Sequence, residues 1–175
     1  SIDSFPKRGG YLTGASDKRA LWRETLDVLG PGRKIGFSWT TGLWNKIYAG
    51  DFFDILDLAP VFALPNTHMV NLQYGECEDD LRRADDHAGI MIHRPAGIDL
   101  RNDLDDLAAL IGELDLVIGP ATSVIAMAGA IGTPCIGMAR TLDWPTLGTE
   151  SQPWTPEMSW IVKGSTRPWA RVAED

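Results

Sequence analysis

The stretch LDLVIGPATSVIAMAGAIGTPCIGMA, from Leu114 to Ala139, contains two short apolar runs on either side of a run of small residues. Residues 115–119 and 134–139 lack a strict alternation of polar and apolar side chains, which is typical of strands buried on both faces. Residues 122–132 are long enough for a buried helix that ends at Gly132. A strand, a helix and a second strand in this order predict one unit of a parallel sheet.

The rest of the chain repeats this alternation of apolar runs and helical patterns. Helices are predicted at residues 17–30, 49–60, 77–89 and 102–114, and strands at 33–39, 67–75, 90–95 and 159–164. In the second of these helices we expect Asp51 to be the N-cap and Pro60 to end the helix. The predicted fold class is therefore α/β, a three-layer Rossmann-like domain with a mostly parallel sheet of five or six strands.

The chain has 175 residues, which is the size of one ordinary domain. We expect a single Rossmann-like domain over residues 1–175, with an extended lead-in at 1–16 and a Trp- and Pro-rich C-terminal wrap at 145–175. The first residue is not Met, so the chain is expected to be a processed product or one half of a larger two-domain protein.

Charge and composition exclude several classes of function. The formal net charge of -8 argues against a nucleic-acid partner, because binding nucleic acid requires a basic surface. No apolar run approaches the ~20 residues that span a bilayer, and no signal sequence precedes the first helix. We therefore expect no membrane span and a cytoplasmic location. Cysteines, histidines and acidic clusters show no metal-ligand spacing, so no metal is expected.

The turn between the strand at 115–119 and the helix at 122–132 is the main candidate site. Ligands of open parallel sheets bind beyond the carboxyl ends of the strands. Gly119 ends the strand, and Thr122 and Ser123 stand at the helix start, where free N–H groups and about half a positive charge favour an anion. Two interpretations remain open, since these hydroxyl groups can bind a phosphate or can cap their own helix.

Four ordered segments resemble one family of enzymes. The helix start Thr122-Ser123, the motifs Ala128-Gly129-Ala130 and Gly132-Thr133-Pro134, and a later segment with Asp143, Trp144, Pro153, Trp154 and Pro156 are similar to the donor-binding stretch of GT-B glycosyltransferases. The resemblance is to the branch that contains the bacterial heptosyltransferases and the transferase domains associated with tetratricopeptide repeats. It extends over roughly residues 30 to 160, because KIGFSWTTG and VNLQYGE match the first two strands and turns.

The resemblance implies that the chain is the C-terminal half, which binds a nucleotide-diphosphate sugar as substrate and needs no other cofactor. A second Rossmann-like domain would supply the acceptor site and the catalytic base, so no catalytic residue is assigned and the isolated chain is expected to be inactive. We expect Lys46 to be the cation beside the diphosphate, although a solvated surface lysine is an equal alternative. The full set of candidate substrate-binding residues is Gly119, Thr122, Ser123, Lys46, Gln73, Tyr74, Asp143 and Trp144.

Two positions depart from the family pattern. Ala121 stands where the family usually has Asp, and Ala126 stands where it usually has His. These changes support an alternative function, in which the chain is a non-catalytic binding or interaction module derived from the same family. A dinucleotide-dependent oxidoreductase is disfavoured, because no Gly-x-Gly-x-x-Gly motif follows the first strand.

Overall fold

The computed structural model describes residues 4–6, 9–41, 50–89, 91–142, 144–150, 152–155 and 157–172. Its centre is one sheet of five parallel strands in the order β2-β1-β3-β4-β5. The strands are β1 (Arg33–Phe37), β2 (Thr67–Asn71), β3 (Leu116–Pro120), β4 (Cys135–Ala139) and β5 (Met158–Val162). The predicted fold class, with a parallel sheet of five or six strands, is confirmed.

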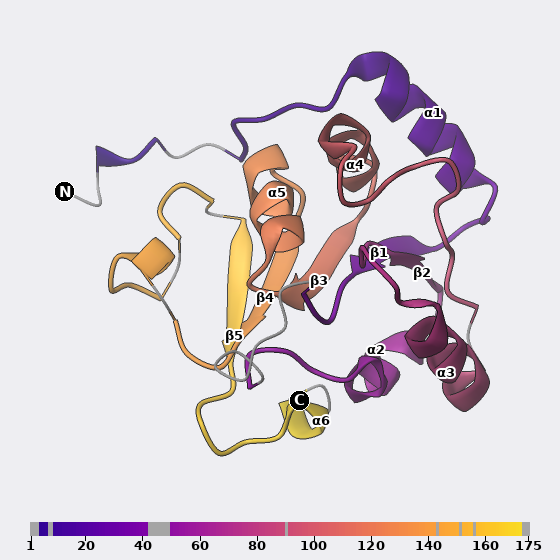
Figure 1. Cartoon of the computed structure of the whole chain (residues 1–175). Coiled ribbons are helices and arrows are strands. Elements are labelled where there is room, and N and C mark those ends of the chain that lie inside the picture. The colour runs from indigo at the N-terminus through magenta and orange to yellow at the C-terminus, as the bar shows by residue number, and fades with distance from the viewer. Residues whose placement is uncertain are drawn as a thin grey trace.

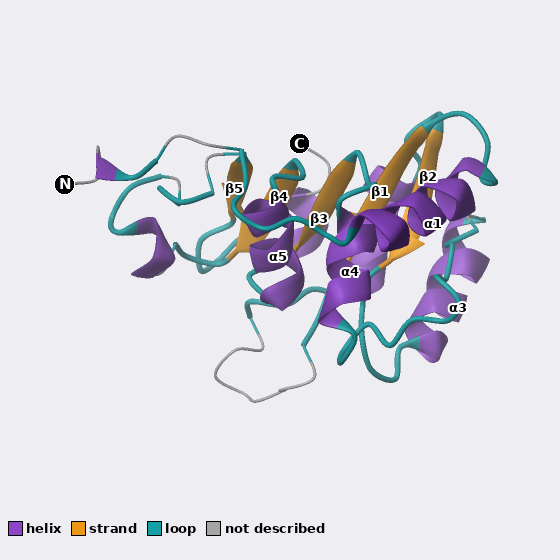
Figure 2. Ribbon diagram, turned by 90° about the horizontal axis from the view of Figure 1, so that it is seen from above, coloured by secondary structure: helices purple, strands orange, loops and turns teal. Residues whose placement is uncertain are grey.

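Helices cover both faces of the sheet and make three layers (Figures 1 and 2). On one face lie α1 (Ser16–Asp27), α4 (Leu104–Ile111) and α5 (Ser123–Ile131). On the other lie the 3-10 helix η2 (Ile55–Leu58), α2 (Ala59–Phe62), α3 (Glu78–Ala88) and α6 (Trp169–Val172), while the short η3 (Trp144–Thr146) follows β4. Each face has its own apolar core: Trp22, Leu110 and Val124 belong to the first, and Phe37 and Leu81 to the second.

The predicted strand at residues 90–95 is wrong in extent. Among its described residues, 91–95, the pairing is a single bridge between His93 and Val70, in which His93 N–H donates to the Met69 carbonyl and the His93 carbonyl accepts from the Asn71 N–H. Pro95 has no N–H to continue the ladder after His93. Before His93, the Ile92 N–H donates to Asp85 Oδ1 at 3.2 Å. With this bridge included, the order is His93, β2, β1, β3, β4, β5.

The predicted helix at 49–60 is also corrected. Asp54, not Asp51, is the N-cap. The Asp54 carboxylate accepts a hydrogen bond from the Leu56 N–H, and the Asp57 carboxylate accepts one from the Asp54 N–H. Pro60 does not end this segment, because it lies in the first turn of α2, where a missing N–H costs nothing. Asp51 instead accepts a 3.1 Å hydrogen bond from the Arg140 side chain, which follows β4.

The lead-in packs against the far end of α5. The N–H groups of Tyr11 and Leu12 both donate to the Ala130 carbonyl, at 2.8 and 2.9 Å. Gly132 ends α5 with a φ of +87°, and a Cβ at this position would collide with the Gly9 carbonyl oxygen.

The C-terminal residues contribute one strand and one short helix. β5 pairs with β4 at the edge of the sheet, and the buried Trp169 ring of α6 lies 5.4 Å from the Phe53 ring. Across the part of the chain that the structure describes, none of the helices has the length and apolar character needed to cross a bilayer.

Candidate functional site at the start of helix α5

Helix α5 begins where the β3 strand ends, beside the end of β1. Thr122 is the N-cap residue, with an extended backbone (φ −119°, ψ 179°) and no capping hydrogen bond from its side chain. Its Oγ1 atom is buried and has no hydrogen-bond partner among the residues that the structure describes. Ser123 is the first helical residue and is exposed. The structure therefore contradicts the capping interpretation for Thr122, and leaves its hydroxyl group uncommitted at the positive end of the helix.

A second unpaired hydroxyl lies next to this helix start. Ser38 follows β1 and is only 1% exposed, and its Oγ has no hydrogen-bond partner in the described part of the chain. Gly119 makes room for it, because a Cβ at Gly119 would lie 2.5 Å from Ser38 Oγ and 3.6 Å from Ile125 in α5. β1 and β3 are neighbours in the sheet. The strand that follows β1, β2, lies toward one edge, and the strand that follows β3, β4, lies toward the other edge. Such a switch point is where open α/β sheets bind ligands.

The structure gives Gln73 and Tyr74 different environments. Gln73 is 2% exposed, and its Oε1 accepts from the N–H groups of Trp39 (3.1 Å) and Thr40 (3.0 Å), while its Nε2 donates to the Tyr74 carbonyl. It thereby ties the turn after β2 to the turn after β1. Tyr74 is half-buried, and its hydroxyl lies 3.3 Å from Thr41 Oγ1.

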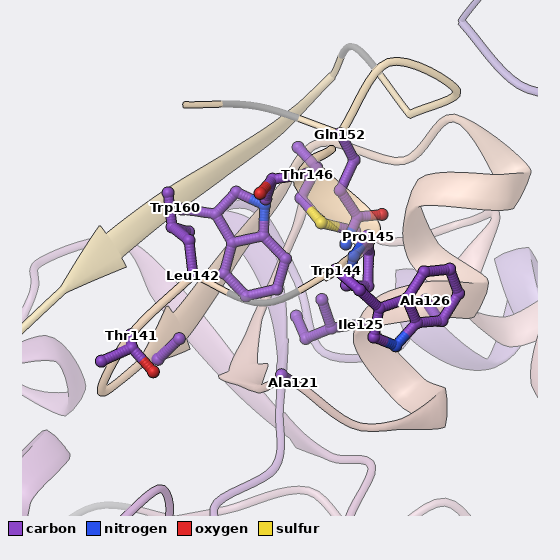
Figure 3. A pocket seen from close by; sticks show the side chains of 12 residues that line it. Ala121, Ile125, Ala126, Thr141, Leu142, Trp144, Pro145, Thr146, Gln152 and Trp160 are labelled. Atoms are coloured by element: carbon purple, nitrogen blue, oxygen red, sulfur yellow. The ribbon is translucent and has the colours of Figure 1, made fainter. Parts of the chain in front are cut away.

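An apolar pocket opens on one side of the α5 start (Figure 3). It has a volume of about 230 Å³, and we call it the Trp144 pocket after its most exposed ring, which is 72% exposed and lies 6.3 Å from the Trp154 ring. Ala121, Ile125 and Ala126 form the wall on the helix side, and Trp160 of β5 lies opposite. The predicted site residues Lys46 and Asp143 lie outside the described residues.

A second hollow, which we call the Arg101 hollow, opens on the other side of the α5 start. Tyr74, Arg101 and Ser123 line it together with Leu100 and apolar residues of α4 and α5, in a volume of about 220 Å³. Arg101 and Tyr74 also line the adjoining hollow beyond the end of β2, which includes Asn71 and Arg94. The start of α5 thus lies between two spaces, of which only the Arg101 hollow has a charged side chain among the described residues of its lining.

Arg101, which was not among the residues predicted from the sequence, supplies a positive charge beside Ser123. Asp99 shapes its turn by accepting from the backbone N–H groups of Arg101 (2.9 Å) and Asn102 (3.1 Å). The side-chain hydrogen bond from Asn102, followed by these backbone bonds, lowers the pKa of Asp99. Among the residues that the structure describes, the Arg101 side chain forms no ion pair within 4 Å, whereas Arg94 pairs with Asp85 and Glu78.

These hydroxyl groups, the helix start and Arg101 are suited to an anion rather than to a metal ion. Charge-assisted hydrogen bonds from such donors are about twice as strong as neutral ones. Within the described part of the chain, no group of three or more His, Cys, Asp or Glu side chains is arranged to hold a metal.

The strand order and the helix start at the switch point define the class: a Rossmann-like α/β domain with the fold found in GT-B glycosyltransferases. Two solved structures share this fold, each at 12% sequence identity and a TM-score of 0.63. They are the E. coli ADP-heptose LPS heptosyltransferase II, for which the match covers 93% of this chain and 51% of that one, and the family 9 glycosyl transferase of Veillonella parvula, for which it covers 91% and 44%. The resemblance to GT-B proteins is confirmed for the fold.

Among curated proteins, the chain is 40% identical over 169 residues to Protein FlbA of Caulobacter vibrioides. The match covers 97% of this chain and 28% of that protein. No protein-family model matches the chain.

Proposed function

We propose that the chain is the donor-binding half of a glycosyltransferase and holds the diphosphate of a nucleotide sugar at the start of α5. The observation that carries the proposal is the Thr122 hydroxyl, which is buried, unpaired and placed at the positive end of this helix. Ser123 adds a second, exposed hydroxyl, and Arg101 adds a cation on the same side of the helix. Phosphate oxygens would satisfy all three.

The rest of the proposal follows from the sequence and the fold. The chain matches only about half of each solved glycosyltransferase, so a second Rossmann-like domain would supply the acceptor site and the catalytic base. The donor would be the substrate and no further cofactor is needed. A cytoplasmic location is part of the same proposal.

A binding experiment tests the role of Thr122. We expect Thr122→Val to weaken binding of ADP, UDP or GDP by more than tenfold, since a charge-assisted hydrogen bond contributes roughly 1.5–3 kcal/mol. The free energy of unfolding should stay the same or rise, because this hydroxyl forms no hydrogen bond in the free protein. Calorimetric titration and urea unfolding of the purified chain measure the two quantities.

Thr133→Val is the matched control at the opposite end of α5. Thr133 Oγ1 is buried and donates to the Ile111 carbonyl at 2.9 Å, so its loss should lower stability by about 1 kcal/mol and leave nucleotide affinity unchanged. If wild type binds none of the three diphosphates, the proposed function is wrong. If Thr122→Val lowers stability as Thr133→Val does, the hydroxyl is structural.

A second candidate function is a non-catalytic binding module. Ala121 and Ala126 favour it, because they place methyl groups where the resembling family has a carboxylate and an imidazole. Failure of the wild type to bind any of the three diphosphates would favour this module. If the wild type does bind one, a transfer assay on the longer protein, with its second domain, separates the two candidates.

A further inference from the structure

The Trp144 pocket has the composition of a site for methyl groups rather than for hydroxyl groups. Ala121 and Ala126 are exposed, and both line the pocket (Figure 3). Ile125 and the indole rings of Trp144 and Trp160 continue the apolar wall.

Its few polar side chains are partly committed within the protein. Gln152 Oε1 accepts a 3.1 Å hydrogen bond from Thr155 Oγ1. The indole Nε1 of Trp160 is buried and has no hydrogen-bond partner among the described residues. Thr141 and Thr146 contribute the remaining hydroxyl groups of the lining. A group rich in hydroxyls would lose hydrogen bonds to water here and regain few.

The pocket is also next to the proposed phosphate position. Ala121 immediately precedes Thr122, and Ala126 lies one turn further along α5. A sugar attached to a phosphate at Thr122 would therefore reach the pocket directly. The Arg101 hollow on the Ser123 side, together with the adjoining hollow that contains Asn71 and Arg94, suits the hydrogen-bonding edges of a nucleoside better.

We propose that the Trp144 pocket receives a methyl-bearing part of the donor sugar, and that the chain selects nucleotide sugars with N-acyl or deoxy groups over fully hydroxylated ones. This inference rests on the proposed function, because it takes the diphosphate to lie at the α5 start. Ala121, Ala126 and Trp144 are then specificity-determining residues. Each buried methyl group should improve affinity by about fourfold.

Matched donors test the preference on the purified chain. UDP-glucose and UDP-N-acetylglucosamine differ by one acetamido group, and GDP-mannose and GDP-6-deoxymannose differ by one hydroxyl. Calorimetric titration should show at least fourfold tighter binding of the acylated or deoxy member in the pair whose base the chain accepts. UDP and GDP alone are titrated first.

The variant Ala126→Asn introduces a polar group into the pocket. It should reduce the preference to less than twofold while leaving the affinity for the nucleoside diphosphate unchanged. Ala20→Asn is the control, because Ala20 is also an exposed alanine within a helix, in α1, and does not line the pocket. It should keep both the preference and the affinity of wild type.

The outcomes separate the two proposals. Binding of UDP or GDP with no preference in either donor pair would overturn this inference and leave the proposed function standing. A loss of affinity for the bare nucleoside diphosphate in Ala126→Asn, but not in Ala20→Asn, would place the base in the pocket and also overturn it. Failure of wild type to bind any diphosphate or donor would overturn both.

Discussion

Gly119 and Ser38 together determine the local packing at the switch point. Ser38 N–H donates to the Ile118 carbonyl at 3.1 Å, which holds the end of β1 against β3. The missing side chain at Gly119 leaves the space that the Ser38 hydroxyl fills. The two positions are therefore coupled, and the shape of the strand ends depends on both.

This coupling predicts the effect of Gly119→Ala. The new Cβ would lie 2.5 Å from Ser38 Oγ, so we expect a loss of roughly 1–3 kcal/mol in the free energy of unfolding, as for other overpacked sites. Adding Ser38→Ala removes the colliding oxygen and should recover part of that loss. The recovery is incomplete because the Ser38 carbonyl oxygen also lies 3.2 Å from the new Cβ. Urea unfolding of both variants measures this recovery. Equal losses of unfolding free energy in the single and the double variant would contradict the coupling.

The site residues were predictable where they lie beside a recognisable element boundary. Thr122 and Ser123 follow a strand and open a helix of small residues, and Trp144 comes shortly after another strand. Arg101 has no such signal, since it lies in an irregular turn and reaches the α5 start only through the packing of that turn beside α4. Ser38 was missed because a lone serine after a strand is common. That its hydroxyl is unpaired depends on neighbours distant in sequence.

Among the elements, the central apolar segments were predicted well, whereas the predicted helix at 49–60 and the predicted strand at 90–95 were not. Strands β3 and β4 and helix α5 lie where the sequence placed them, because burial on both sides demands continuous apolar residues. The predicted helix at 49–60 became a 3-10 turn followed by a short α-helix, since Asp54 and Asp57 form a capping box that starts the helix later. The predicted strand at 90–95 is a single bridge, because pairing at the sheet edge requires N–H groups that Pro95 lacks.

That edge of the sheet should respond to pH. Burial, followed by the nearby His68 and Lys34 charges, lowers the pKa of His93 below its usual value of 6.5, and the rings of His68 and His93 lie 5.8 Å apart. The unfolded chain therefore binds this proton more readily than the folded protein. Stability should fall as pH drops below 6.5 and level off below the folded-state pKa.

We expect His93→Gln to show a smaller loss of stability between pH 7.5 and pH 5 than wild type, by urea unfolding at both values. His87→Gln in the last turn of α3 is the control, because His87 is exposed and away from this pair. A pH dependence that is the same in wild type and His93→Gln would contradict the assignment.

For the molecule as a whole, the main expectation is that this chain binds the donor and that a second domain binds the acceptor. The chain supplies the start of α5, which is suited to an anion, with the Trp144 pocket and the Arg101 hollow on either side of it. No catalytic base is assigned to the chain. We expect no sugar transfer by the isolated chain with any nucleotide sugar, because the acceptor site would lie on the second domain. Product analysis by mass spectrometry measures this, and turnover that tracks the purified chain through successive columns would contradict it.

The pairing of β1 with β3 also has a kinetic consequence. Ile35 lies opposite Leu116, so the contact that creates the switch point must close a loop containing β2, α3 and α4. Parallel pairing between strands distant in sequence slows folding, because closing the loop costs chain entropy before the contact contributes any favourable free energy. The anion position exists only after this closure, so a bound nucleotide would stabilise the chain against global unfolding rather than against local fraying. Its protection of backbone amides against hydrogen exchange would reach β1 and β3 together.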